Sequence, residues 1–129
     1  MFHYTVETTN SVEETIKNLE MKLKEEQFGV LWQFDIKAKL LEKGLDFQDD
    51  YQVLEVCNPV EAQRVLNHNK MIGYFLPCKI VVYADKGKTM LGMPKPSFLI
   101  NSVAEDDSEL QEMAIDIENR LITCLDKSI

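Results

Sequence analysis

The chain has 129 residues, and its 14 Lys and Arg against 22 Asp and Glu give a formal net charge of −8. Hydrophobic residues make up 45% and charged residues 28%, proportions of an ordinary globular protein that exclude the disordered, collagen-like and transmembrane classes. An acidic surface repels phosphate backbones and anionic lipids, so we expect neither a nucleic acid nor a membrane as partner.

We expect residues 1–129 to form a single domain, since this length suits one compact core. The first residues carry neither a basic leader nor an apolar run of signal-peptide length, so the expected location is the cytoplasm. The three cysteines are Cys57, Cys78 and Cys124. Their odd number and wide spacing argue against a disulfide framework and a zinc ribbon, and indicate reduced thiols.

The first third of the chain predicts two strands and two helices. Residues 2–7 alternate between apolar and polar side chains, as a half-buried strand does. Ser11 and Glu14 have capping-box spacing, so a helix with one apolar face is expected to begin there. Residues 28–36 alternate again and are predicted to place one set of side chains on a shared face: Phe28, Val30, Trp32, Phe34 and Ile36. Residues 37–43 favour a short helix.

The remainder of the chain predicts three strands and two further helices. A strand at residues 51–56 leads to Asn58, a helix cap followed by Pro59 in the first turn. Residues 79–83 are almost continuously apolar, which is typical of a central strand. A hairpin turn at residues 85–88 joins it to a strand at 89–93. Ser108 is expected to cap the last helix.

The predicted order of elements is β-α-β-(short α)-β-α-β-β-α. It indicates the α+β class, a two-layer sandwich with a mainly antiparallel sheet and helices packed on one face.

Two segments carry a resemblance to a known family. Val56-Cys57-Asn58-Pro59 and the later run from Ile72 to Tyr83, with its Leu76-Pro77-Cys78 segment, resemble the domain of unknown function 302 family. The likeness in element order covers nearly the whole chain. It implies a fold like that of the TATA-binding-protein group, often assembled as a homodimer, and it implies no established activity. A fold analogy carries no inference of DNA binding.

Cys57 is the sharpest candidate for chemistry. It precedes the Asn58 cap, so we expect its sulfur near free N–H groups at a helix start, where the thiol pKa falls. Cys78 begins the next strand, and the helix between them can bring both thiols to one sheet edge. Two converging thiols would suit a soft metal or a reversible disulfide. The alternative is that both cysteines are small buried hydrophobes.

Other polar candidates have simpler explanations. Asp35 and Glu55 could face each other across paired strands and act as acid and base, or could decorate a solvent-facing surface. His3 and His68 are the only imidazoles, and neither lies in a catalytic pattern. His68 is expected to interact with the C-terminal end of a helix. No glycine-rich phosphate loop or nucleophile elbow occurs.

Apolar side chains offer a ligand site and a dimer surface. An aromatic and methionine set could line a pocket or form plain core: Trp32, Phe34, Tyr74, Phe75, Met90 and Met93. The segment that follows the strand at residues 89–93 is expected to be irregular. Four side chains at the end of this strand and in the segment after it are candidates for a dimer patch: Leu91, Met93, Pro94 and Phe98. The candidate ligand-binding residues are Cys57, Asn58, Pro59, Pro77, Cys78 and Trp32.

These observations favour a non-enzymatic homodimeric module that binds a small apolar ligand or a partner, with no cofactor. The alternative is a thiol site built on Cys57 and Cys78 for soft-metal or redox chemistry. An enzyme is the least favoured class, because no convincing set of acid, base and nucleophile is present.

Overall fold

A five-stranded antiparallel sheet organises the molecule, and the computed structural model describes all residues, 1–129. In spatial order the strands are β1-β5-β4-β3-β2, so the apolar run that predicted a central strand does lie at the centre. The strands are β1 (His3–Thr8), β2 (Gly29–Asp35), β3 (Tyr51–Cys57), β4 (Cys78–Asp85) and β5 (Lys88–Pro94).

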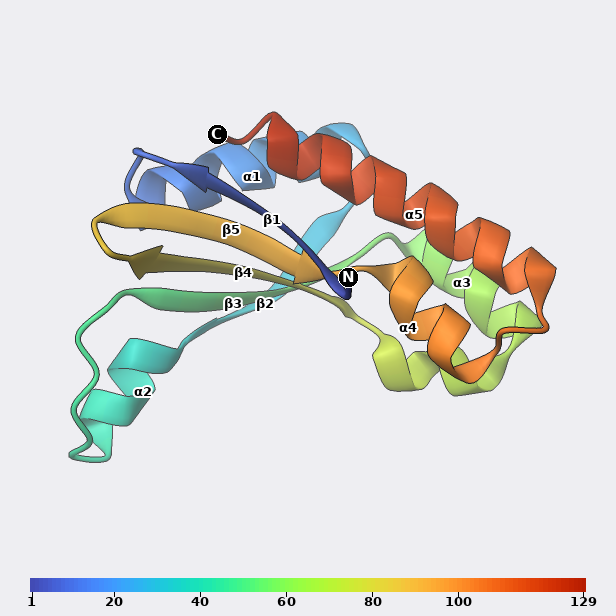
Figure 1. Ribbon diagram of the computed structural model, residues 1–129, viewed down its shortest axis with the longest axis horizontal. Coiled ribbons are helices and arrows are strands. Elements are labelled where there is room, and N and C mark those ends of the chain that lie inside the picture. Colours follow the sequence, from blue (N-terminus) through green and yellow to red (C-terminus); the bar gives the residue numbers. More distant parts are fainter.

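Two long helices cover one face of this sheet, and shorter helices lie at its two ends (Figure 1). The helices are α1 (Val12–Glu25), α2 (Ile36–Glu42), α3 (Pro59–His68), the 3-10 helix η1 (Lys70–Phe75), α4 (Pro96–Val103) and α5 (Ser108–Asp126). The predicted α+β class is therefore confirmed. None of these helices combines the length and the apolar character that crossing a membrane requires.

Local capping signals determine where the main helices begin. Ser11 accepts a hydrogen bond from the backbone N–H of Glu14 at 3.0 Å, which confirms the predicted start of α1. Asn58 caps α3, also as predicted. The cap of α5 is Asp107 and not Ser108, because the Asp107 carboxylate accepts the N–H of Leu110 at 3.0 Å. A carboxylate suits the positive end of a helix.

The core lies between the sheet and helices α1 and α5. It contains 20 buried hydrophobic residues that form one cluster. Leu91 and Met93 belong to this cluster, since both lie on β5 and face the helices. The expected dimer patch on these two residues is therefore wrong, because neither side chain reaches the surface.

A β-bulge in β2 changes which side chains face the core. Val30 pairs with Val56, but Trp32 pairs with Glu55, so Leu31 is an inserted residue. An inserted residue reverses the alternation of faces beyond it. Trp32 consequently turns away from the core. The prediction that alternate side chains share one face along the whole of residues 28–36 is therefore wrong.

Helix α4 occupies a segment that was expected to be irregular. Its N-cap, Lys95, makes no side-chain capping bond. The cap comes instead from α5. The buried Glu118 carboxylate accepts one hydrogen bond from the Ser97 N–H at 3.0 Å and another from the Ser97 hydroxyl at 2.6 Å. The helix therefore depends on a contact between segments about 20 residues apart in sequence.

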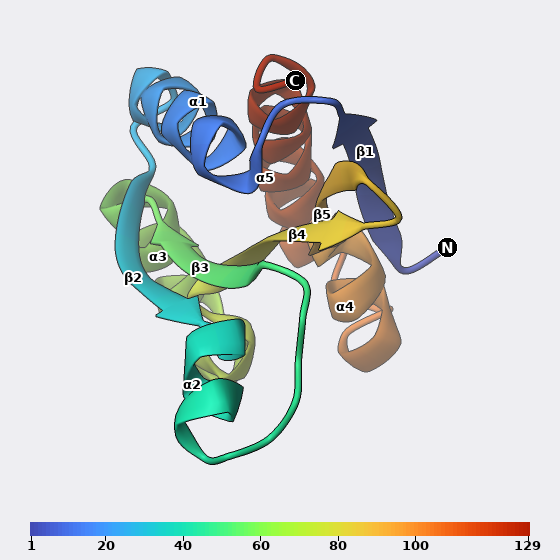
Figure 2. The same cartoon turned by 90° about the vertical axis from the view of Figure 1, so that its left-hand side faces the viewer.

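The molecule has the shape of an arch. Helices α1 and α5 lie above the sheet, whereas α2 at one end and α4 at the other lie below it, as two views at right angles show (Figure 1, Figure 2). The second face of the sheet thus forms the roof of the arch and has no long helix packed against it.

Candidate functional site

A cavity of about 380 Å³ lies where the sheet ends against the α4 side of the arch. Its walls come from β3, β4, β5, α3, η1, α4 and α5. Thirteen of the 18 lining residues are hydrophobic. The deep part is formed by buried side chains, which include Met93, Ile100, Leu110, Ala114 and Leu121. The size and character fit a small-molecule pocket, since such pockets have volumes of about 300–1,000 Å³ and mostly apolar walls.

The mouth of the cavity carries its only two charged residues, Glu55 and Lys79. The Lys79 ammonium donates a hydrogen bond to the Glu55 carboxylate at 3.3 Å. The Glu55 side chain is only 18% exposed and that of Lys79 is 50% exposed. Tyr74, which is 84% exposed, lies at the same opening. The site is thus an apolar chamber with a single ion pair at its entrance.

Two of the six candidate ligand-binding residues line this cavity, and so do three members of the aromatic and methionine set, Tyr74, Phe75 and Met93. Pro77 and Cys78 form part of the wall where the chain enters β4, and the Leu76–Pro77 peptide bond is cis. Cys57 is not among the lining residues, although it lies on the neighbouring strand. The register explains this difference. Val56 pairs with Cys78, so these two share the core face, and Cys57 is one position further on.

Because side chains alternate along a strand, Cys57 and Cys78 point to opposite faces of the sheet. The structure therefore does not direct the two thiols toward each other. No group of three or more His, Cys, Asp or Glu side chains is arranged to hold a metal ion. The soft-metal and disulfide alternative gains no support from this geometry, since both versions need converging sulfurs.

The thiol pKa values also differ from the expectation. Burial raises the pKa of Cys57 above its usual value, although the residue directly precedes the start of α3. Burial raises the pKa of Cys78 to about 11, and the nearby Cys57 and Glu55, when charged, add to the increase. The prediction that the pKa of Cys57 is lowered is therefore wrong, because the loss of solvent around the thiol has a larger effect on its pKa than the nearby start of α3. Both thiols are protonated at neutral pH and are poor nucleophiles.

The other three predicted ligand residues serve the framework. Asn58 is buried and caps α3, accepting the N–H groups of Val60 and Glu61 at 3.0 and 3.2 Å. Pro59 is exposed in the first turn of that helix. Trp32 lies on the uncovered sheet face, where it stacks on Phe34 with ring centres 5.2 Å apart. None of the three lines the cavity.

The carboxylate pair considered for acid–base chemistry does not form. Asp35 pairs with Gln52 in the sheet, whereas Glu55 is three positions further along β3 and pairs with Trp32. The Asp35 carboxylate instead caps α2, accepting the N–H of Ala38 at 2.8 Å.

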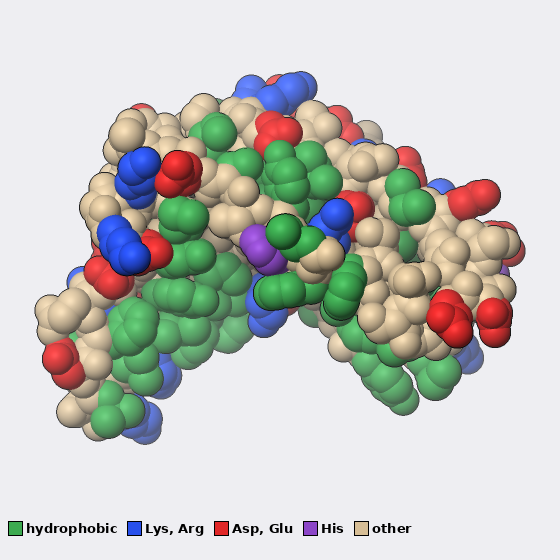
Figure 3. Space-filling view, viewed as in Figure 1, with side chains coloured by type: hydrophobic (Ala, Val, Ile, Leu, Met, Phe, Trp, Pro, Cys, Tyr) green, Lys and Arg blue, Asp and Glu red, His purple; other side chains and the backbone are tan.

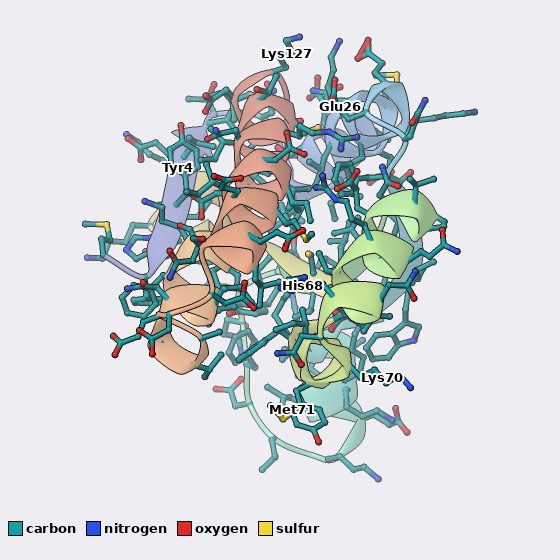
Figure 4. All side chains as sticks on the ribbon, turned by 90° about the vertical axis from the view of Figure 1, so that its right-hand side faces the viewer. Tyr4, Glu26, His68, Lys70, Met71 and Lys127 are labelled. Carbon is teal, nitrogen blue, oxygen red and sulfur yellow. The ribbon has the colours of Figure 1, made fainter.

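His68 links two elements that form walls of the cavity. It lies at the end of α3, on the side of that helix toward α5 (Figure 4). Its Nε2 is 2.8 Å from the Asp107 carboxylate at the start of α5. The N–H of Leu110, and to a lesser extent His68, hold the pKa of Asp107 below its usual value. His68 is the last residue of α3, as expected, and it also forms a hydrogen bond to a neighbouring helix. This contact fixes α3 against α5, the helices that contribute Val65 and Leu110 to the cavity.

Apolar side chains also cover the underside of the arch, where they form a continuous surface in the space-filling view (Figure 3). Besides the Trp32–Phe34 stack, Tyr51 and Tyr83 stack across neighbouring strands with ring centres 5.2 Å apart. We call the surface formed by Trp32, Phe34, Tyr51, Val81 and Tyr83 the aromatic face. Trp32 is 54% exposed on it.

Comparison with known proteins places this architecture in a family. The model of the family described as Domain of unknown function DUF302 matches residues 4–128. The chain therefore belongs to this family, and the resemblance carried by the Asn-Pro and Leu-Pro segments is confirmed. No curated protein matches the chain.

A solved structure agrees closely with this fold. It is the crystal structure of an uncharacterized conserved DUF302 protein from Bacillus stearothermophilus, to which the chain is 56% identical. The likeness covers 100% of this chain and 99% of that one, with a TM-score of 0.95.

Proposed function

We propose that this protein is a non-enzymatic binding module that holds a small apolar ligand in the cavity between the sheet end and helices α3, η1, α4 and α5. The cavity itself carries the proposal. Enclosed apolar space that remains unfilled costs packing energy, because its walls lose dispersion contacts. A ligand that fills such a space recovers those contacts and removes its own apolar surface from water.

The direct test fills the cavity from within. Ala114 is buried on α5 and lines the space, so Ala114→Leu adds a side chain where the ligand would lie. With n-butylbenzene as the probe, binding measured by calorimetry should weaken roughly tenfold or more. The free energy of unfolding should stay unchanged or rise by about 0.5–2 kcal/mol, as cavity-filling changes commonly do. Ala114→Met is the second variant, since its flexible side chain fits with less strain.

Ala38→Leu provides the matched control, because it makes the same change at an exposed position of α2, outside the cavity. It should leave n-butylbenzene binding unchanged. Failure of the wild-type protein to bind the probe would overturn the proposal. Equal binding by wild-type protein and both folded Ala114 variants would also overturn it.

We further propose that the aromatic face is covered by a second copy of this chain. In a pair related by a two-fold axis the same face serves both copies. The apolar character of the face supports this occupant, because Trp32 is 54% exposed on it and an exposed apolar patch marks an interaction site. A second copy would cover it with a face that carries the same aromatic stacks.

Light scattering of two matched variants tests the dimer. The wild-type protein should give a mass near twice 14.9 kDa. Trp32→Glu places a charge on the aromatic face and should shift the mass toward one chain. Ile115→Glu makes the same kind of change on α5, at a side chain that is 47% exposed, and should leave the dimer intact. A wild-type monomer at all concentrations, or equal dissociation of both variants, would contradict the assignment.

A further inference from the structure

We propose that Glu55 selects the polar end of the ligand, so that the cavity takes an apolar molecule that ends in a hydrogen-bond donor, an amine or a hydroxyl, in preference to one that ends in a carboxylate. This inference rests on the proposed ligand-binding function. It identifies Glu55 as a specificity-determining residue and the mouth of the cavity as the place where the ligand's polar end lies.

The first support is the unused acceptor capacity of the Glu55 carboxylate. An ionised carboxylate offers about four lone-pair sites. The structure fills one of them, with the hydrogen bond from Lys79 to one oxygen at 3.3 Å. Glu55 is one of the residues that line the cavity and its side chain is mostly buried, so water reaches the remaining sites of its carboxylate poorly. A hydrogen-bond donor on a ligand would occupy one of these free acceptor sites, at the polar point of an otherwise apolar wall.

The second support is the sign of the electric field at the mouth. The carboxylate is more enclosed than the ammonium of Lys79, whose half-exposed charge is screened by solvent. The effect of Glu55 reaches the cavity wall, because its charge helps to raise the pKa of Cys78. The net charge of −8 acts in the same direction over longer distances. An anionic group entering this mouth would therefore be repelled.

Four probes share a closely similar phenylbutyl body and differ in their end group, so they separate the contribution of the polar end to the affinity from that of the apolar body. They are n-butylbenzene, 4-phenylbutan-1-ol, 4-phenylbutylamine and 4-phenylbutyrate, each titrated into the wild-type protein by calorimetry. The amine and the alcohol should bind more tightly than n-butylbenzene. The affinity for the amine should exceed that for the carboxylate by roughly tenfold or more, since hydrogen bonds to charged groups are stronger than those between neutral groups.

Glu55→Gln tests the assignment to this residue. It removes the negative charge and keeps one acceptor oxygen, so the amine should lose its advantage over the carboxylate while the alcohol keeps most of its affinity. Glu7→Gln is the matched control. Glu7 also lies on a strand and pairs with a lysine, Lys88, at 3.5 Å, yet it is outside the cavity.

The outcomes distinguish this inference from the proposed function. If n-butylbenzene binds but 4-phenylbutyrate binds as tightly as the amine, the role of Glu55 is overturned and the cavity function stands. If Glu55→Gln and Glu7→Gln have equal effects on the ratio of amine to carboxylate affinity, the assignment is likewise overturned. If none of the four probes binds, the proposed function itself fails.

Discussion

At the scale of single residues, burial decides the chemistry of the cysteines. The position of Cys57 before a capped helix was predicted correctly, and Asn58 and Pro59 start α3 as the sequence indicates. The thiol pKa nevertheless rises, because the loss of solvent depends on tertiary packing that a local motif does not encode. The opposite orientations of Cys57 and Cys78 likewise follow from sheet register, which is set by the pairing of β3 with β4.

The pKa of Cys78 gives a prediction for its labelling with methyl methanethiosulfonate, which converts a thiolate to a methyl disulfide and releases methanesulfinate. A thiol reacts as its thiolate, so a pKa near 11 leaves roughly one Cys78 in a hundred ionised at pH 9. The labelling rate of Cys78, followed by peptide mass spectrometry, should rise about tenfold for each pH unit from 7 to 10. A rate that levels off below pH 9 would mean that the pKa of Cys78 is not raised.

At the scale of elements, the sequence predicts those whose signals are local. The caps Ser11 and Asn58 lie within the segments they start, and the apolar stripe of α5 is complete in one stretch of chain. Helix α4 was missed because its cap, Glu118, belongs to α5 and joins it only in the folded protein. The bulge at Leu31 was missed because an inserted residue is defined by the partner strand, β3.

The cap from Glu118 gives a stability prediction. Glu118→Ala leaves the half-buried N–H and hydroxyl of Ser97 without their acceptor, so the free energy of unfolding should fall by about 1–3 kcal/mol. Glu118→Gln retains an acceptor oxygen and should lose less. Urea unfolding of the three proteins measures both differences. If Glu118→Ala were as stable as the wild-type protein, α4 would not depend on this contact.

At the scale of the whole molecule, the cavity results from elements that are far apart in sequence. Glu55 from β3, Met93 from β5 and Leu121 from α5 meet at one point only because the sheet order places β3, β4 and β5 beneath α5. Pro77 and Cys78 could be predicted from the sequence because they lie in the distinctive Leu-Pro-Cys segment. The side chains of α4 and α5 in the wall, such as Ile100 and Ala114, have the same pattern as ordinary core residues and carry no signal of their own.

The most direct test of the cavity as a binding site compares the two half-buried thiols within one protein. Cys78 lines the cavity and Cys57 does not, so Cys57 is an internal control. Saturating n-butylbenzene, added at a fixed pH before methyl methanethiosulfonate, should slow the labelling of Cys78 severalfold and leave that of Cys57 unchanged. Equal labelling of Cys78 with and without n-butylbenzene, or equal slowing of both cysteines, would contradict the account.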